Sequence, residues 1–128
     1  NFEKAKWTDW NEASYYGRMF ARSGGVAGAV EQMLKELKME DFEFNPIVCD
    51  GIDNAEQALL KASKGVLPNN FIEGMACEGG CVGGPSAYND QFSSKKNRDA
   101  LISQADDRGI HENLSRYQMD SFSMHSKR

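Results

Sequence analysis

The feature that most constrains the fold is a strand, a helix and a second strand that follow one another in mid-chain. Phe42 to Cys49 is rich in aromatic and β-branched residues, as β-strands are, although Pro46 favours an edge position or a bulge. Phe71 to Met75 is predicted to be the second strand. Because a helix separates the two strands, we expect them to pair in parallel as a βαβ unit.

The helix between the strands carries signals at both of its ends. Asp53 followed by Glu56 resembles a capping box, which satisfies free amides at a helix start. Lys61 and Lys64 lie in the last turn, where cations suit the negative end of the helix dipole, and Gly65 supplies the stop. The apolar side of this helix is predicted to contain Ala55, Ala58, Leu59 and Ala62.

Further helices are predicted on either side of the βαβ unit. Ser23 is the expected N-cap of a helix whose apolar residues recur at three- and four-residue spacing: Val26, Val30, Met33, Leu34 and Leu37. Lys95 to Asp106 is predicted to be helical, and a short turn of helix around Ile110 follows. The predicted fold class is therefore α/β, with a small parallel sheet containing the βαβ unit, packed helices and an irregular helical C-terminal tail.

Composition limits the protein classes to which the chain can belong. Its 128 residues fit one domain, and no apolar run approaches the roughly 18 residues of a membrane span. The net charge of −4 gives no reason to expect nucleic acid or a membrane as partner. An odd number of cysteines, with Cys77 and Cys81 close together, argues against a disulfide framework and favours a metal-related protein of the reducing cytoplasm.

The stretch that indicates chemistry is the glycine-rich loop after the second strand, which contains Cys77 and Cys81. Open α/β sheets usually bind ligands at the C-terminal ends of their strands. Cysteine thiolates are the soft ligands of iron–sulfur clusters, and glycines let backbone approach such a group closely. We expect the loop to lie beside the N-terminus of the helix near Gly24, where the helix dipole favours an anionic group. With no group bound, its glycines have no internal reason to hold one shape.

Other interpretations of this loop are weighed against the metal site. It can be a tight turn with two small buried cysteines, and structural zinc would need a second ligand pair that the sequence does not show. Cys49 ends a strand and is expected to pack, while His111 and His125 lie in a polar tail and are not expected to be ligands. A phosphate loop is excluded because the Gly-Lys-Ser/Thr ending and the G-x-G-x-x-G spacing are missing.

The stretch from Glu73 through Gly84 has the pattern Glu-x-Met-Ala-Cys-x-x-Gly-Cys-x-x-Gly. Position for position, this pattern resembles the last signature of the [FeFe]-hydrogenase catalytic domain. Ser23-Gly24-Gly25-Val26 is similar to the Thr-Gly-Gly-Val segment of that family, and the resemblance spans Ser14 to Lys96. It implies that Cys77 ligates the [4Fe–4S] part of the H-cluster. Cys81 would ligate the same cubane and bridge to the diiron subsite, and Met75 would lie beside that subsite.

The resemblance also implies what the chain lacks. The other signatures of the family, of the Thr-Ser-Cys-Cys-Pro and Met-Pro-Cys-x-x-Lys types, are absent, and a cubane needs about four thiolates. We therefore expect a C-terminal fragment, inactive alone, of an iron–sulfur oxidoreductase that reversibly reduces protons to hydrogen. The expected partners are the rest of the catalytic domain and a ferredoxin-like electron carrier. The family belongs to anaerobic metabolism.

Three regions are predicted: an N-terminal arm over residues 1–13, a hydrogenase-like lobe over 14–92, and a helical tail with a frayed end over 93–128. The chain continues Gly83-Gly84-Pro85 where catalytic family members usually have Gly-Gly-Gly-Gln-Pro. This form resembles sensory or low-activity branches of the family. The alternative function is therefore a redox-sensing or regulatory iron–sulfur module on the same scaffold without hydrogen turnover. A stand-alone structural domain with a relic loop is a third possibility.

Overall fold

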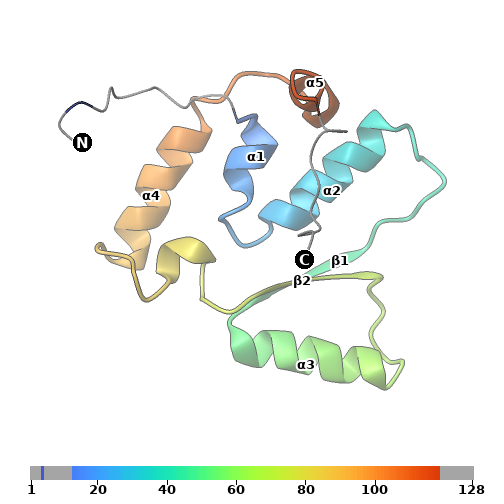
Figure 1. Ribbon diagram of the computed structural model, residues 1–128. Coiled ribbons are helices and arrows are strands. Elements are labelled where there is room, and N and C mark those ends of the chain that lie inside the picture. The colour runs from blue at the N-terminus through green and yellow to red at the C-terminus, as the bar shows by residue number, and fades with distance from the viewer. Residues whose placement is uncertain (1–3, 5–12, 119–128) are drawn as a thin grey trace, which may run out of the picture.

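The computed structural model describes Lys4 and residues 13–118 (Figure 1). The described helices and strands run in the order α1 (Tyr15–Met19), α2 (Gly25–Glu36), β1 (Pro46–Asp50), α3 (Ile52–Ser63), β2 (Phe71–Met75), the 3-10 helix η2 (Cys81–Gly83), α4 (Gln91–Ile102) and α5 (Ile110–Leu114). Most of the predicted arm (residues 1–13) and the end of the predicted tail beyond residue 118 lie outside the described residues. No helix within the described ranges is long and apolar enough to span a bilayer.

The two strands form a parallel sheet joined by α3, which confirms the predicted α/β class and the βαβ unit. The register pairs Pro46 with Phe71 and Asp50 with Met75. The second strand has the predicted bounds, whereas the first is five residues long and begins at Pro46 rather than Phe42. Proline lacks the N–H that a ladder needs, so the start of a strand is a position that tolerates it.

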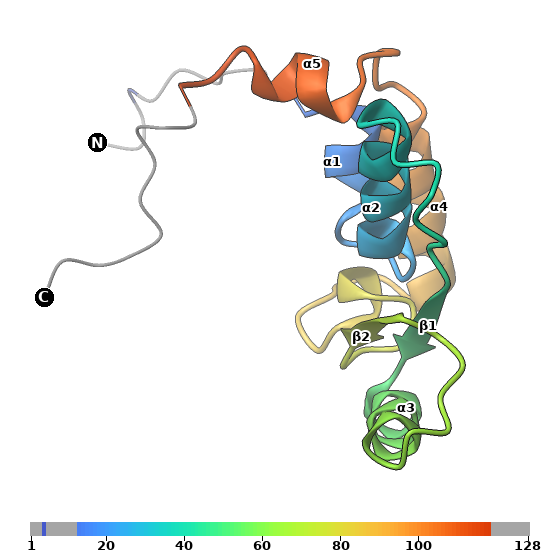
Figure 2. The ribbon, with the colours of Figure 1, turned by 90° about the vertical axis from the view of Figure 1, so that its right-hand side faces the viewer.

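Helices lie on both sides of this sheet. Helix α3 lies on one side, and α2 with α1 and α4 lies on the other (Figures 1 and 2). Side chains alternate between the two faces of a strand, so neighbouring residues of β2 point to different layers. Gly74 faces α3, where an added Cβ would lie 3.6 Å from the Cβ of Ala55, and Glu73 faces α2.

The helix starts differ from those that the sequence predicts. Ser23 is not the cap of α2, because the N-cap is Gly24 in a left-handed conformation (φ 83°) and makes no side-chain cap bond. Asp53 lies in the first turn of α3, whose N-cap is Gly51, so the predicted capping box is wrong. At the other end of α3, the helix stops as expected before Gly65, which has a positive φ of 68°.

The buried apolar core of the described residues is built mainly from small side chains. Leu37 and Leu59, both predicted to face the core, are 56% and 60% exposed. No large side chain in the described part of the chain is completely buried. The buried apolar residues are Met19, Ala27, Ala29, Cys49, Ala58 and Ile102. Small side chains allow helices and strands to approach closely, but each of them removes little apolar surface from water. Polar contacts between the elements therefore help to fix their relative positions.

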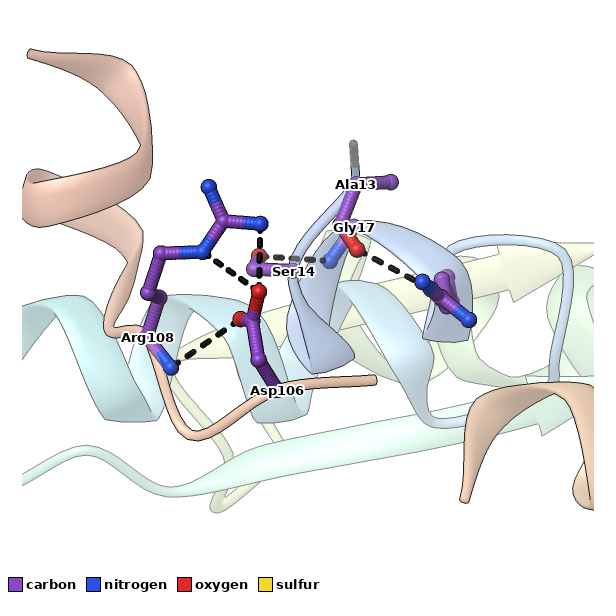
Figure 3. A network of polar contacts seen from close by, with 6 residues as sticks. Ala13, Ser14, Gly17, Asp106 and Arg108 are labelled. Atoms are coloured by element: carbon purple, nitrogen blue, oxygen red, sulfur yellow. Dashed lines mark hydrogen bonds and ion pairs between the residues drawn. The ribbon is translucent and has the colours of Figure 1, made fainter. Parts of the chain in front are cut away.

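Arg18 makes such a contact between the first helix and the tail. Its Nε donates to the carbonyl of Ala13 (2.9 Å, Figure 3), and its Nη1 donates to that of Leu101 (2.8 Å), 83 positions away in the chain. The carbonyl of Leu101 belongs to the last turn of α4, where carbonyls have no partner within the helix. An Asp106–Arg108 ion pair closes the turn that follows (Figure 3).

The tail is helical as predicted, with shifted bounds. Helix α4 begins at Gln91 rather than Lys95, because the side chain of Asp90 accepts a hydrogen bond from the Ser93 amide (3.0 Å) and caps the helix there. It ends at Ile102, and α5 forms the predicted short turn from Ile110. In α5 the amides of Ile110 and His111 donate to the two carboxylate oxygens of Glu36 at 2.9 and 2.8 Å.

This contact predicts that acid weakens the docking of α5. The amide of His111 chiefly lowers the pKa of Glu36 below its ordinary value of about 4.5. A carboxyl whose pKa is lower in the folded state contributes stability above its unfolded pKa and loses it as the pH falls through the folded pKa. We expect the protection of the α5 amides against hydrogen exchange, measured by NMR relative to the intrinsic rate at each pH, to fall below about pH 4.5 in the wild type. In Glu36→Gln, this protection should be lower at neutral pH and should depend less on pH. Identical pH profiles for the two proteins would contradict the role of Glu36.

Candidate functional site

The glycine-rich loop leaves the C-terminal end of β2, as the sequence predicts. Cys77 follows the strand by two residues and is half-buried, and Cys81 begins η2 and is exposed. Cys49 lies within β1 with only 3% of its surface exposed, in agreement with its predicted packing role. The loop therefore contributes two free thiols at the end of a parallel strand, the edge at which α/β sheets usually bind ligands.

The loop lies directly beside the start of α2, which confirms the predicted neighbourhood. The amide of Cys81 donates to the carbonyl of Ala21 (3.0 Å), and Gly80 forms an antiparallel bridge with Arg22. Ala21 and Arg22 belong to the short connection between α1 and α2. Cys81 is thus held by backbone contacts to a segment nearly sixty residues earlier in the chain.

Gly80 is the residue that makes this close contact possible. It is buried and has a positive φ of 84°, a conformation that other residues rarely adopt. An added Cβ would lie 2.6 Å from the Ala21 carbonyl oxygen and 3.0 Å from the sulfur of Met75. The glycine therefore lets the loop backbone pack between the α1–α2 connection and the Met75 side chain, which brings Met75 to the cysteine loop.

Asp50 holds the middle of the loop from the neighbouring strand. It is the last residue of β1, and its two carboxylate oxygens accept from the amide of Gly79 at 2.7 and 2.8 Å. The side chain of Gln91, at the start of α4, donates to the carbonyl of Glu78 (2.9 Å). The sequence predicts no internal reason for the loop to hold one shape, and these contacts from β1 and α4 hold it from outside.

Glu73 is the residue that sequence reasoning passed over. Its side chain is buried (5% exposed), and its Oε1 and Oε2 accept from the amides of Gly24 (2.8 Å) and Ala27 (2.7 Å). Glu73 therefore caps α2 in place of Ser23, and its negative charge lies at the positive end of the helix dipole. The sequence signal that could have revealed it is an acidic residue between Ile72 and Gly74 in a strand that is otherwise apolar.

This cap changes the expected role of the helix start. The prediction placed an anionic bound group at the N-terminus of α2, yet two of the amides there already bond to a carboxylate of the protein. The loop still lies beside the helix, and the contacts that connect the two run through backbone. The helix start therefore supports the loop through backbone contacts. The anion at its N-terminus is the Glu73 carboxylate.

The thiols present fit part of an iron–sulfur cluster. A [4Fe–4S] cubane is held by about four cysteine thiolates, and the loop offers Cys77 and Cys81. An added Cβ at Gly84 would lie 3.6 Å from the Cys77 sulfur, so glycine keeps that side of the thiol uncrowded. Within residues 13–118 and Lys4, no three histidine, cysteine or acidic side chains gather where a metal ion could be held. The loop fits two corners of a cubane, and the remaining thiolates would have to come from elsewhere.

The two histidines do not complete the ligand set in the described structure. His111 is exposed in α5, which packs beside the end of α2 that is remote from the loop (Figure 1). His125 lies outside the described residues. His111 therefore lies away from the two thiols of the loop.

Comparison with known proteins identifies one family. The family model described as "Iron only hydrogenase large subunit, C-terminal domain" matches residues 1–85, which is about two-thirds of the chain. The match covers the βαβ unit and ends at Pro85, directly after the glycine loop, so α4 and α5 lie beyond it. No curated protein matches the chain.

The contacts of Gly80 predict a large effect of a single methyl group. Gly80→Ala should destabilise the protein more than Gly65→Ala, by about 1–3 kcal/mol, the usual cost of overpacking. Both glycines have positive φ, but nothing lies within 4 Å of a Cβ added at Gly65, so that variant is a matched control for backbone strain alone. Urea unfolding of the two variants measures the difference. Equal losses would show that the loop can move away from Ala21 without cost.

Proposed function

The chain belongs to the family of the iron-only hydrogenase large subunit, C-terminal domain, and on this premise we propose that its glycine loop supplies two thiolate ligands to an H-cluster. Cys77 would ligate the [4Fe–4S] cubane. Cys81 would ligate the same cubane and bridge to the diiron subsite, beside which Met75 would lie. The family relationship makes iron–sulfur cofactors the expected chemistry of the protein in which this chain works.

The observation that carries the proposal is the placement of Cys77 and Cys81 on a loop held from three sides. Asp50 accepts the amide of Gly79, and Ala21 accepts that of Cys81, so the chain's own contacts hold the backbone of the loop that bears both thiols. A cluster needs ligands of fixed spacing, and a loop that is already in place loses less entropy when it binds. The alternative of a tight turn with two buried cysteines does not describe Cys81, which is exposed.

The sulfur of Met75 supports the proposed place of the diiron subsite. This sulfur would lie 3.0 Å from a Cβ added at Gly80, the residue directly before Cys81. Met75 and Glu73 point to the same face of β2, the face toward α2, because side chains two apart in a strand share a face. The thioether therefore lies on the side of the sheet where Cys81 is held.

The cluster, when bound, would supply the redox chemistry for the reversible reduction of protons to hydrogen. The residues of this chain would orient it. Cys77 would be fixed by the strand that precedes it, and Cys81 by its amide bond to Ala21. The remaining thiolates would come from another part of the same catalytic domain, and electrons from a ferredoxin-like carrier in the cytoplasm.

Exchange of each cysteine in a protein that contains the whole catalytic domain tests the ligand roles. Each variant would leave about three thiolates on the cubane, so Cys77→Ser and Cys81→Ser should both lower its retention. Cys81→Ser should in addition disturb the junction to the diiron subsite. Iron quantitation and EPR spectroscopy distinguish the two outcomes, with Cys49→Ser, at a buried position in β1, as control. Full iron loading and unchanged spectra in both loop variants would show that neither cysteine is a ligand.

The 128-residue chain by itself should fold but retain no stable [4Fe–4S] cluster and evolve no hydrogen. Its helices and βαβ unit are held by contacts among the chain's own residues, while its loop offers two thiolates where about four are needed. Anaerobic reconstitution with iron and sulfide, desalting, visible absorption and iron analysis measure the result. About four irons retained per monomer would refute the half-site. About four per dimer would mean that two chains share a cluster through their loops.

A further inference from the structure

We propose that Glu73 is the positioning residue for Cys81, acting through the start of α2. The role rests on the proposed function, in which Cys81 is a cluster ligand. Glu73 and Cys81 are eight positions apart, yet the structure connects them by way of a segment some fifty residues earlier, residues 21–27. The connection consists of hydrogen bonds, and its first link depends on a single side chain that one substitution can remove.

The first link joins the Glu73 carboxylate to α2. Its two oxygens each accept from one amide, that of Gly24 at 2.8 Å and that of Ala27 at 2.7 Å. Hydrogen bonds to a charged acceptor are stronger than neutral ones, and burial at 5% exposure shields this pair from water. A buried carboxylate without partners would be costly, so Glu73 and the helix start hold one another in place.

The second link joins the helix start to the loop. The amide of Gly25 donates to the carbonyl of Arg22 (2.9 Å), which fixes the three residues before the helix. Arg22 in turn pairs with Gly80, and Ala21 accepts the amide of Cys81 (3.0 Å). Release of Gly24 and Ala27 from Glu73 would therefore loosen the backbone segment against which Cys81 is held.

Strand β2 thus serves both cysteines by different routes. It continues directly into Cys77, so that the first thiol is placed by the chain itself. The second thiol lies four residues further along, beyond Gly79 and Gly80, which both have positive φ. Because glycine backbone is flexible, these two residues by themselves do not fix the position of Cys81 relative to β2. The Glu73 carboxylate instead links β2 to the start of α2, and the segment before α2 holds Cys81 by backbone hydrogen bonds.

A carboxylate is required because two donors three residues apart must be accepted at once. The side-chain amide of glutamine offers one acceptor oxygen and would turn its own N–H groups toward the other donor. Glu73→Gln should keep one of the two bonds, and Glu73→Ala should keep neither. A graded response across these two variants is expected if the two hydrogen bonds carry the effect.

Amide hydrogen exchange of the 128-residue chain, followed by NMR, tests this connection without iron. In Glu73→Ala we expect the Cys81 amide to exchange about tenfold faster or more, together with Gly24 and Ala27, as for loss of a charge-assisted bond. Glu73→Gln should give an intermediate rate. Glu56→Gln is the matched control, because Glu56 is an exposed glutamate on α3, across the sheet from α2 (Figure 2). Its Cys81 rate should equal that of the wild type.

Two results would overturn the proposal. An unchanged Cys81 rate with faster Gly24 and Ala27 exchange would show that Glu73 is only a helix cap. Faster exchange at Cys81 in the Glu56→Gln control would show a general loosening. If Glu73→Ala unfolds the chain, exchange in α3 rises as well, and the Glu73→Gln variant then decides.

A second measurement connects positioning with ligation. In a protein that contains the whole catalytic domain, Glu73→Ala should retain less iron after desalting than the wild type, and Glu73→Gln should restore part of it. Full iron retention in Glu73→Ala, with fast Cys81 exchange, would overturn the positioning role but leave the ligands in place. If Cys77→Ser and Cys81→Ser retain all iron, the proposed function fails, whatever the exchange rates show.

Discussion

The bond between the Glu73 carboxylate and the first amides of α2 is the contact on which the arrangement of the site depends. It joins the sheet to the helical layer at the point where the cysteine loop meets both. Burial of a charged carboxylate is unfavourable, but two charge-assisted hydrogen bonds and the positive end of the helix dipole offset that cost. Removal of either partner would leave the other buried without a hydrogen-bond partner, at a cost in free energy. The interaction therefore fixes the position of α2 relative to β2.

The same device recurs at two more places in the described residues. Glu36 accepts the amides of Ile110 and His111 and so attaches α5 to the end of α2, and Asp50 accepts the amide of Gly79 and attaches the loop to β1. In each case the acceptor is a carboxylate from another segment, and the donors are backbone N–H groups. Since the buried apolar residues are mostly small, these polar contacts supply relative placement that a larger apolar core would otherwise give.

The loop consequently combines flexible residues with fixed surroundings. Gly79 and Gly80 take positive φ values, which allows the sharp course between the two cysteines, while Asp50 and Ala21 hold the backbone from outside. That combination agrees with membership of an iron–sulfur family, because a bulky anionic cluster requires close backbone approach together with thiolates at fixed spacing. The two thiols of the loop support the proposal that it forms one side of a shared centre.

Local properties of the sequence determined the βαβ unit, the parallel pairing, the stop at Gly65, and the position of Cys77 after β2. These features can be predicted from short stretches of sequence, because residue type, short-range periodicity and the backbone freedom of glycine act within a few positions along the chain. The caps predicted at Ser23 and Asp53 were wrong, and the acceptor that replaces Ser23 lies 49 and 46 positions from its two donors. Only the tertiary structure brings Glu73 to Gly24, Asp50 to Gly79 and Ala21 to Cys81, because a hydrogen bond between distant segments depends on how the layers pack, and no short stretch of sequence contains that information.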